Sequence, residues 1–128
     1  MDINQLSSLI IKAAINIHKE LGPGLLESVY QSCMIIELDK MGIKAQSEVP
    51  VEILYSGQKI TDAGFRIDLL VDDTIVVELK SVGQVQDVHK KQLLTYLRLA
   101  NKPLGLLINF NEVLLKNGIT RIINTQPD

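Results

Sequence analysis

Two acids and a lysine lie in a short segment that otherwise has the composition of two apolar strands. The segment RIDLLVDDTIVVELK spans residues 66–80 and contains Asp68, Glu78 and Lys80. Because side chains alternate between the two faces of a strand, Glu78 and Lys80 share one face. An unpaired charge is costly to bury in a sheet, so each of these side chains needs a partner.

The length of the turn between the two strands decides whether the acids face each other. If residues 72–74 form a three-residue connection, Val71 pairs with Ile75. Asp68 then lies directly opposite Glu78, whereas a two-residue loop would put the two acids on opposite faces. The segment lacks the Asn-Gly or Asp-Gly of a two-residue turn, and aspartate tolerates the left-handed conformation that longer loops need. We therefore predict the three-residue loop and the facing acids.

Facing acids beside a lysine suit metal-assisted phosphate chemistry. Directly opposed cross-strand side chains have Cβ atoms about 5 Å apart, where like charges are destabilising unless a cation neutralises them. Mg²⁺ prefers oxygen ligands, uses one or two protein carboxylates and leaves positions for water and substrate phosphate. Lys80 could hold the attacking water or stabilise charge on a phosphate. The alternative is a surface hairpin with a weak Glu78–Lys80 ion pair and a solvated Asp68, and the spacing alone leaves both interpretations open.

Helices are predicted on both sides of this segment. Apolar residues recurring at three- and four-residue steps predict two helices, over about residues 4–21 and 25–41, and each ends before a glycine. A third helix is predicted from Asp87, as its N-cap, to about Ala100. The predicted inward positions of the first two helices are Leu6, Leu9, Ile10, Ala13, Ile17 and Leu21, then Leu26, Val29, Tyr30, Cys33, Met34, Leu38 and Met41.

Strands are predicted from alternation and from apolar runs between turn residues. They are predicted at residues 49–55, 59–65, 66–71, 75–80 and 104–110. The first two form an antiparallel hairpin around Ser56-Gly57, and the last is apolar enough to be covered on both faces. Asn117-Gly118, within residues 113–122, signals a further two-residue hairpin turn. The element order predicts an α/β fold with a central mixed β-sheet flanked by helices.

Composition predicts a single domain over residues 1–128. The chain is 46% apolar and 22% charged, an ordinary globular balance. It has no apolar run of the roughly 18 residues that a membrane span needs, and its N-terminus lacks a secretory pattern, so we expect a cytoplasmic protein without membrane association. The lone Cys33 cannot form an internal disulfide. A net charge of -2 gives no global attraction to nucleic acid, so phosphate binding must be local.

Several segments resemble a known nuclease superfamily. Asp68 followed by Glu78-Leu79-Lys80 resembles the signature of the PD-(D/E)XK nuclease superfamily. The segment GLLESVY, residues 24–30, matches the motif that names the GxxExxY protein family within it. The likeness continues in the family's order through IHKELGPGLLESVY, RIDLLVDDTIVVELK, HKKQLLTYL and GLLINF. One departure is Ile67, which stands where the superfamily name has proline.

The resemblance implies a restriction-endonuclease-like fold with a metal-dependent phosphodiesterase site. Asp68 and Glu78 match the metal-binding acids, the backbone carbonyl of Leu79 would be a further ligand, and Lys80 matches the catalytic lysine. The implied cofactor is Mg²⁺, with Mn²⁺ as the alternative, and the implied substrate is DNA or RNA.

Two residues of the second helix have two interpretations. Glu27 and Tyr30 are three apart and therefore adjacent on the helix. From the residues alone, Gly24 is the N-cap, Glu27 reaches back to it from position N3, and Tyr30 belongs to the core. The resemblance implies instead that Glu27 is an acid that acts on the metal from a flanking helix, directly or through water, with Tyr30 beside it.

His89, Gln92 and Tyr96 form a polar stripe on the third helix. The stripe is either a helix edge that meets water or part of the site. The resemblance places Gln92 near the catalytic lysine, where its amide could orient Lys80 or a phosphate, with His89 and Tyr96 in support. A general-base role for His89 is the weaker hypothesis, since the superfamily's chemistry uses metal and lysine.

Three functions follow from these observations. The leading hypothesis is a Mg²⁺-dependent nuclease that cleaves DNA or RNA with activated water. The second is a catalytically silent binding or regulatory module that keeps the nuclease fold, acting as a homodimer in one version. The third is a scaffold in which Glu78 and Lys80 only pair with each other, and it requires Asp68 and Glu78 to point to different faces.

Overall fold

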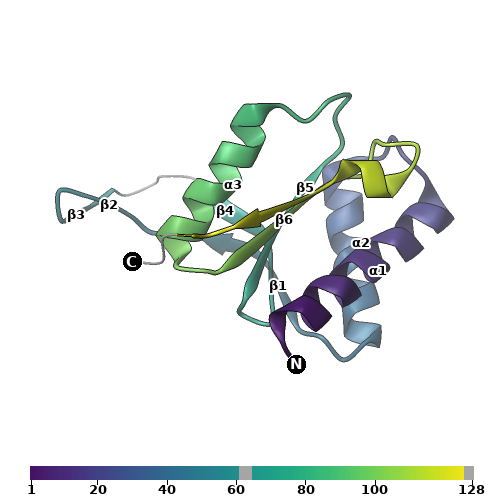
Figure 1. Cartoon of the computed structure of the whole chain (residues 1–128), viewed down its shortest axis with the longest axis horizontal. Coiled ribbons are helices and arrows are strands. Elements are labelled where there is room, and N and C mark those ends of the chain that lie inside the picture. The colour runs from purple at the N-terminus through teal and green to yellow at the C-terminus, as the bar shows by residue number, and fades with distance from the viewer. Residues whose placement is uncertain (61–64, 126–128) are drawn as a thin grey trace.

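A mixed five-stranded sheet forms the centre of the protein, and helices cover both of its faces (Figure 1). The structure, a computed structural model, describes residues 1–60 and 65–125. In chain order its elements are α1 (Ile3–Leu21), α2 (Glu27–Lys40), β1 (Ala45–Pro50), β2 (Ile53–Tyr55), β3 (Gln58–Ile60), β4 (Arg66–Val71), β5 (Ile75–Lys80), α3 (Asp87–Ala100), β6 (Leu104–Asn109), the 3-10 helix η1 (Leu115–Gly118) and β7 (Ile119–Ile123). The sheet order is β1-β4-β5-β6-β7, with β5 and β6 parallel and the other neighbours antiparallel. The predicted mixed sheet flanked by helices is confirmed.

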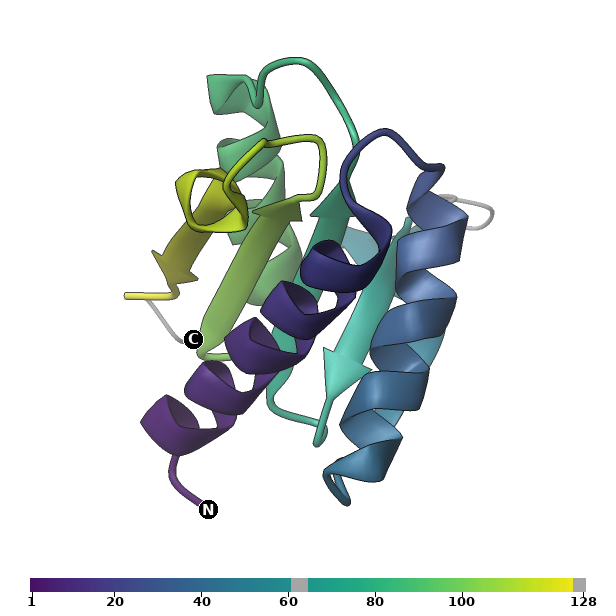
Figure 2. The ribbon, with the colours of Figure 1, turned by 90° about the vertical axis from the view of Figure 1, so that its right-hand side faces the viewer.

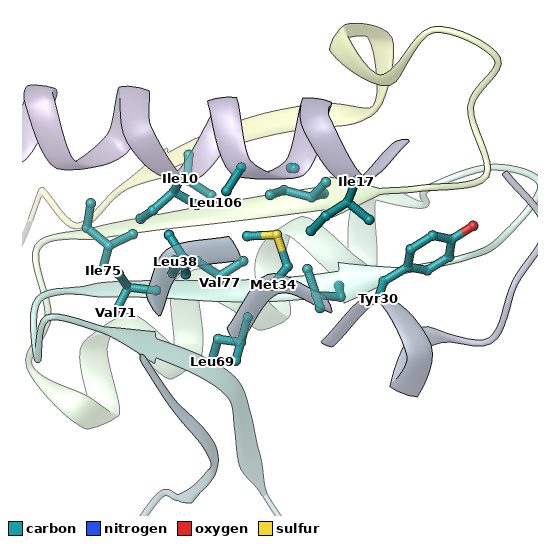
Figure 3. Packing of buried hydrophobic residues seen from close by; sticks show 14 of the residues in the cluster. Ile10, Ile17, Tyr30, Met34, Leu38, Leu69, Val71, Ile75, Val77 and Leu106 are labelled. Atoms are coloured by element: carbon teal, nitrogen blue, oxygen red, sulfur yellow. The ribbon is translucent and has the colours of Figure 1, made fainter. Parts of the chain in front are cut away.

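The helices divide the core into two layers. α1 and α2 lie side by side over one face of the sheet, and α3 covers the other (Figure 2). Ile10 of α1 and Val77 of β5 belong to the larger buried cluster, beneath α1 and α2 (Figure 3). Val76, the neighbour of Val77, packs with Leu97 in the smaller cluster beneath α3, as alternation along a strand requires. Within the described ranges, no helix has both the length and the hydropathy of a membrane-spanning segment.

The first two helices follow the predicted periodicity at most positions. The confirmed inward residues are Leu6, Ile10, Ala13, Ile17, Tyr30, Met34 and Leu38, and Leu9, Cys33 and Met41 are partly buried against them. The prediction is wrong for Leu21, Leu26 and Val29, which are exposed. α2 begins two residues later than predicted, at Glu27, so Leu26 lies before the helix, and its buried face runs from Tyr30 through Met34 to Leu38.

Tyr30 explains where α2 begins. Its hydroxyl donates to the carbonyl of Gly22 at 2.6 Å and accepts the backbone amide of Leu25 at 3.2 Å. Its ring stacks on Phe110, with centroids 4.2 Å apart and planes 8° from parallel. The loop between α1 and α2 is therefore fastened to a buried side chain, and a backbone φ of 93° at Gly24 suits the glycine there.

The predicted strand 49–55 is two strands in different sheets. β1 pairs with β4 in the central sheet, while β2 pairs with β3 in a separate hairpin that stands away from the body (Figure 1). The amide of Val51 donates to the carbonyl of Phe65 at 3.0 Å, and the chain leaves the central sheet beyond this bond. The hairpin around Ser56-Gly57 is confirmed for residues 53–60, and residues 61–64 of its predicted second strand lie outside the described residues.

The C-terminal turn differs from the prediction. β6 pairs antiparallel with β7, and the connection between them contains η1 instead of a two-residue Asn117-Gly118 turn. Leu115 is buried, which draws residues 115–118 against the body. A Cβ at Gly118 would lie 2.5 Å from the carbonyl oxygen of Asn109, so this glycine permits a close approach of two backbones. All six residues of β6 are buried, as predicted for a strand covered on both faces.

Candidate active site

A three-residue connection joins β4 to β5, as predicted. Val71 pairs with Ile75, and residues 72–74 form the turn. Asp72 and Asp73 have positive φ angles, 51° and 53°, the left-handed conformation that aspartate tolerates. Continued one residue beyond its last pair, Leu69 with Val77, this register leads to Asp68 and Glu78, and the hydrogen bonds of the two carboxylates confirm that the acids meet.

The two acids lie between the strands that carry them. The amide of Asp68 donates to Oε1 of Glu78 at 3.3 Å, and the amide of Leu79 donates to Oδ2 of Asp68 at 2.8 Å. Each strand thus gives a backbone donor to the carboxylate of the other, beyond the last regular pair, Leu69 with Val77. Because the carboxyl groups converge, the scaffold hypothesis, which requires them to diverge, is wrong.

Burial keeps the acid pair from holding two full negative charges. Glu78 is only 7% exposed, and burial together with the charge of Asp68 raises its pKa to about 9. Burial also raises the pKa of Asp68, and the charge of Glu48 acts in the same direction. Lys80 opposes both shifts without cancelling them. At neutral pH the metal-free pair therefore retains a proton. Retention of a proton shows that the positive charge of Lys80 is too small to balance two ionised carboxylates at this place.

Lys80 is partly exposed at the end of β5, and none of the ion pairs within residues 1–60 and 65–125 includes it. In the described part of the chain its ammonium forms no ion pair, so the alternative of a Glu78–Lys80 pair is wrong. The charge of Lys80 still acts on both acids, so it lies near them. A partly exposed ammonium group beside an acid pair can receive an anionic ligand.

The donor set at the acid pair fits a hard divalent cation. Both side chains offer only oxygen, the ligand type that Mg²⁺ and Mn²⁺ prefer. The N–H and C=O of one strand residue point to the same neighbouring strand. The Leu79 amide points to Asp68 of β4, while the carbonyl of Lys80 accepts the amide of Phe110 beside β6. The Leu79 carbonyl therefore faces β4 as well, where it could join Asp68 and Glu78 as a ligand.

Glu27 is placed at the end of β5 and not in a three-acid cluster. Among residues 1–60 and 65–125, no group of three or more His, Cys, Asp or Glu side chains could hold a metal ion. Oε2 of Glu27 accepts the amide of Ser81 at 3.0 Å, and the Ser81 hydroxyl donates to the carbonyl of Leu25 at 2.7 Å. Glu27 is the first residue of α2, so the predicted capping by Gly24 and Glu27 is wrong. Its carboxylate holds the residue that follows Lys80.

The polar stripe of α3 divides between the site and the helix itself. Burial, and then the charges of Glu78 and Asp68, raise the pKa of Tyr96, which places this phenol beside the acid pair. Gln92 lowers the pKa of Tyr96 by hydrogen bonding to it, so the amide lies at the same place. His89 instead accepts the amide of Gln86 on Nδ1 at 2.9 Å and caps its own helix. Gln86, not the predicted Asp87, is the N-cap.

Asn109 supports the site and was not predicted. It is 1% exposed, its Nδ2 donates to the carbonyl of Val82 at 2.9 Å, and its Oδ1 accepts the amide of Val82 at 3.2 Å. It also pairs with Lys80 in the parallel register of β5 and β6. Both residues after Lys80 are thus fastened, Ser81 by Glu27 and Val82 by Asn109. An asparagine inside the apolar run LGLLINF is the signal that could have identified it.

Three further residues near the site carry no recognisable sequence signal. Phe65 precedes β4 and meets Tyr96 edge to face, with ring centroids 5.5 Å apart. Gln31 of α2 donates both to the carboxylate of Glu48 on β1 and to the backbone carbonyl of Asp68. These contacts join elements that are distant in the sequence, so local patterns do not predict them.

Comparison with known families gives a match over nearly the whole chain. A family model described as the PD-(D/E)XK nuclease superfamily matches residues 4–122, which include every candidate site residue named above. No curated protein and no solved structure matches the chain. With the mixed sheet and its flanking helices, this match confirms the restriction-endonuclease-like fold that the sequence resemblance implied.

Proposed function

This chain belongs to the PD-(D/E)XK nuclease superfamily, and from that membership we propose that it is a metal-dependent nuclease that hydrolyses phosphodiester bonds in DNA or RNA. Nucleases of this superfamily generally require a divalent metal ion. The segment of residues 24–30 supports the narrower assignment to the GxxExxY family. The observation that carries the proposal is the convergence of Asp68 and Glu78 between two strands, where the nearby positive charge does not suffice to keep both carboxylates ionised.

The chain's own residues divide the work between holding the cation and handling the phosphate. Asp68, Glu78 and the carbonyl of Leu79 would hold Mg²⁺ or Mn²⁺. When bound, the ion supplies a Lewis acid that polarises a phosphoryl oxygen and acidifies water. Lys80, two residues after Glu78 on β5 and without a salt bridge to any described residue, stabilises negative charge on the phosphate or orients the attacking water. Clamping of Ser81 and Val82 fixes the backbone from which Lys80 extends.

Other residues act on these groups from the flanking helices. Gln92 and Tyr96 of α3 lie beside the acid pair, where the Gln92 amide can orient Lys80 or a phosphate oxygen. Glu27, at the start of α2, would act on the bound ion through water. Tyr30 and His89 support the site by fastening the loop before α2 and the start of α3.

A catalytically silent module is the second candidate. The net charge of -2 and the absence of a large basic run favour weak attraction to polyanions, which suits a binding or regulatory role, including one as a homodimer.

Cleavage and binding assays separate the two candidates. Purified protein is incubated with single- and double-stranded DNA and RNA in Mg²⁺, in Mn²⁺ and in EDTA. The nuclease proposal expects cleavage that requires the ion and stops in EDTA. Metal binding by calorimetry without cleavage of any of the four substrates would support the silent module, and absence of both would refute the nuclease.

A further inference from the structure

One glutamine links α2 to two strands at the position of the first metal-binding acid. Nε2 of Gln31 lies 3.2 Å from Oε2 of Glu48 on β1 and 3.2 Å from the backbone carbonyl of Asp68 on β4. A side-chain amide has two N–H donors, so one group can serve both acceptors. Gln31 follows Glu27 by one helical turn, so both side chains leave α2 on the face that meets the site.

The regular alternation of side chains between the two faces of the sheet is interrupted in β4 at Asp68. Ile67 packs in the cluster beneath α3, whereas Leu69 packs in the cluster beneath α1 and α2. Residues two apart on a regular strand share a face, so the alternation of β4 shifts by one position at Asp68. The shift turns the amide of Asp68 toward Glu78 and leaves its carbonyl to Gln31. Side chains thus serve both backbone groups of Asp68.

The neighbouring strand is distorted at the same level. Regular pairs flank the position, Ser47 with Leu69 and Val49 with Ile67, and Glu48 lies between them opposite Asp68. Glu48 has a φ of 52°, a left-handed conformation that a glutamate adopts only when its surroundings enforce it. The Glu48 carboxylate is exposed, and its one hydrogen bond among the described contacts comes from Gln31. Gln31 is therefore the group that couples the distortion of β1 to that of β4.

We propose that Gln31 and Glu48 are positioning residues that hold β4 in its shifted phase and thereby direct the Asp68 carboxylate into the gap beside Glu78. This inference rests on the proposed function, because it assigns the pair to the metal site. The two residues do not touch the substrate. Gln31 acts through the carbonyl of Asp68, and Glu48 acts by fixing the amide of Gln31.

Two substitutions separate the hydrogen bond from the charge. Gln31→Met keeps the length of the side chain and removes both donors. Glu48→Gln keeps an oxygen that can accept from Gln31 and removes the negative charge. Gln46→Met, an exposed position on the same strand as Glu48, is the matched control.

The first measurement uses metal-free protein and follows hydrogen exchange at the amide of Leu79, which is bonded to Asp68. In Gln31→Met this amide should exchange about fivefold faster, while the amide of Val76 in the middle of β5 changes little. Glu48→Gln and Gln46→Met should leave Leu79 protected. Equal acceleration at Leu79 and Val76 would overturn the inference, because Gln31 would then be a general stabiliser.

The second measurement is Mn²⁺ affinity by isothermal titration calorimetry. Gln31→Met should weaken binding about tenfold, the usual scale for a residue that orients a ligand, and Gln46→Met should not. Unchanged exchange at Leu79 together with unchanged affinity in Gln31→Met would overturn the proposal. If the unmodified protein binds no divalent ion, the proposed nuclease function fails, and the exchange experiment still decides whether Gln31 positions Asp68.

Discussion

The carboxylate of Glu78 accepts the backbone amide of Asp68 at 3.3 Å, so one acid of the pair is bonded to the peptide of the other. The carboxylate of Asp68 in turn accepts the amide of Leu79 at 2.8 Å. Backbone groups thus hold the two acids close together, and a shared proton or, under the proposed function, a cation relieves the repulsion between them. The behaviour of this pair leads to the following predictions.

Replacing the lysine beside the pair should remove activity and spare the fold. Lys80→Ala should lower kcat about 100-fold or more, because it removes a group that stabilises charge in the transition state. Lys40→Ala, at an exposed position near the end of α2, is the control and should cleave normally. Steady-state cleavage in saturating Mg²⁺ measures both, and full activity in Lys80→Ala would refute the catalytic role.

The metal-free protein should lose stability as pH rises. The folded-state pKa of Glu78 is raised from 4.5 to about 9, so between these values the folded chain binds more protons than the unfolded chain. Stability therefore falls across this window, by at most about 1.4 kcal/mol per pH unit from this one group. Glu78→Gln has no proton to lose and should be the more stable protein at pH 8, with a flatter profile.

Urea unfolding in EDTA from pH 5.5 to 8.5 measures this difference. Glu52→Gln, which removes an exposed carboxylate on the loop before β2, should retain the steep profile of the unmodified protein. A profile of the unmodified chain as flat as that of Glu78→Gln would contradict a raised pKa at Glu78.

Glu27→Gln should separate the two roles of this residue. An amide oxygen can still accept the Ser81 N–H, so stability should change little. Loss of the negative charge should weaken Mn²⁺ binding about tenfold if Glu27 acts on the ion through water. Calorimetric titration and thermal unfolding measure the two effects. An unchanged Mn²⁺ affinity would refute a role of Glu27 at the metal and leave only its structural contact between α2 and the end of β5.

Tyr30→Phe should affect stability and leave the chemistry intact. The substitution leaves the carbonyl of Gly22 and the amide of Leu25 without the hydroxyl, which should cost about 1–2 kcal/mol of unfolding free energy. The control is Tyr55→Phe, at an exposed residue of β2. Cleavage that disappears from a Tyr30→Phe protein of normal stability would instead show that the hydroxyl takes part in the reaction.

The acid pair could be predicted from sequence because it depends on local features. Alternation along β5 and the odd number of residues in the turn are both properties of fifteen consecutive residues. Sequence reasoning did not predict that the acids lie between the strands instead of on one face. That placement depends on the phase shift of β4 at Asp68, which involves Gln31 and Glu48 from other elements.

The errors at the ends of elements also have tertiary causes. Asn117-Gly118 is a strong local turn signal, yet the glycine serves a close approach to Asn109, and this contact overrides the local preference. Gly24 has the residue type of a helix cap, yet the hydroxyl of Tyr30 fixes the loop so that α2 begins at Glu27. In both cases a contact with a buried residue nearby in the chain, and not the preference of the turn or cap residues, decides the backbone conformation.

The parallel pairing of Lys80 with Asn109 has a consequence for the order in which the site is synthesised and assembled. Asp68, Glu78 and Lys80 are synthesised before β6, the strand that seats the end of β5 and fastens Val82 through Asn109. We expect a nascent chain that stops before Leu104 to carry the reactive side chains without the frame that aligns them.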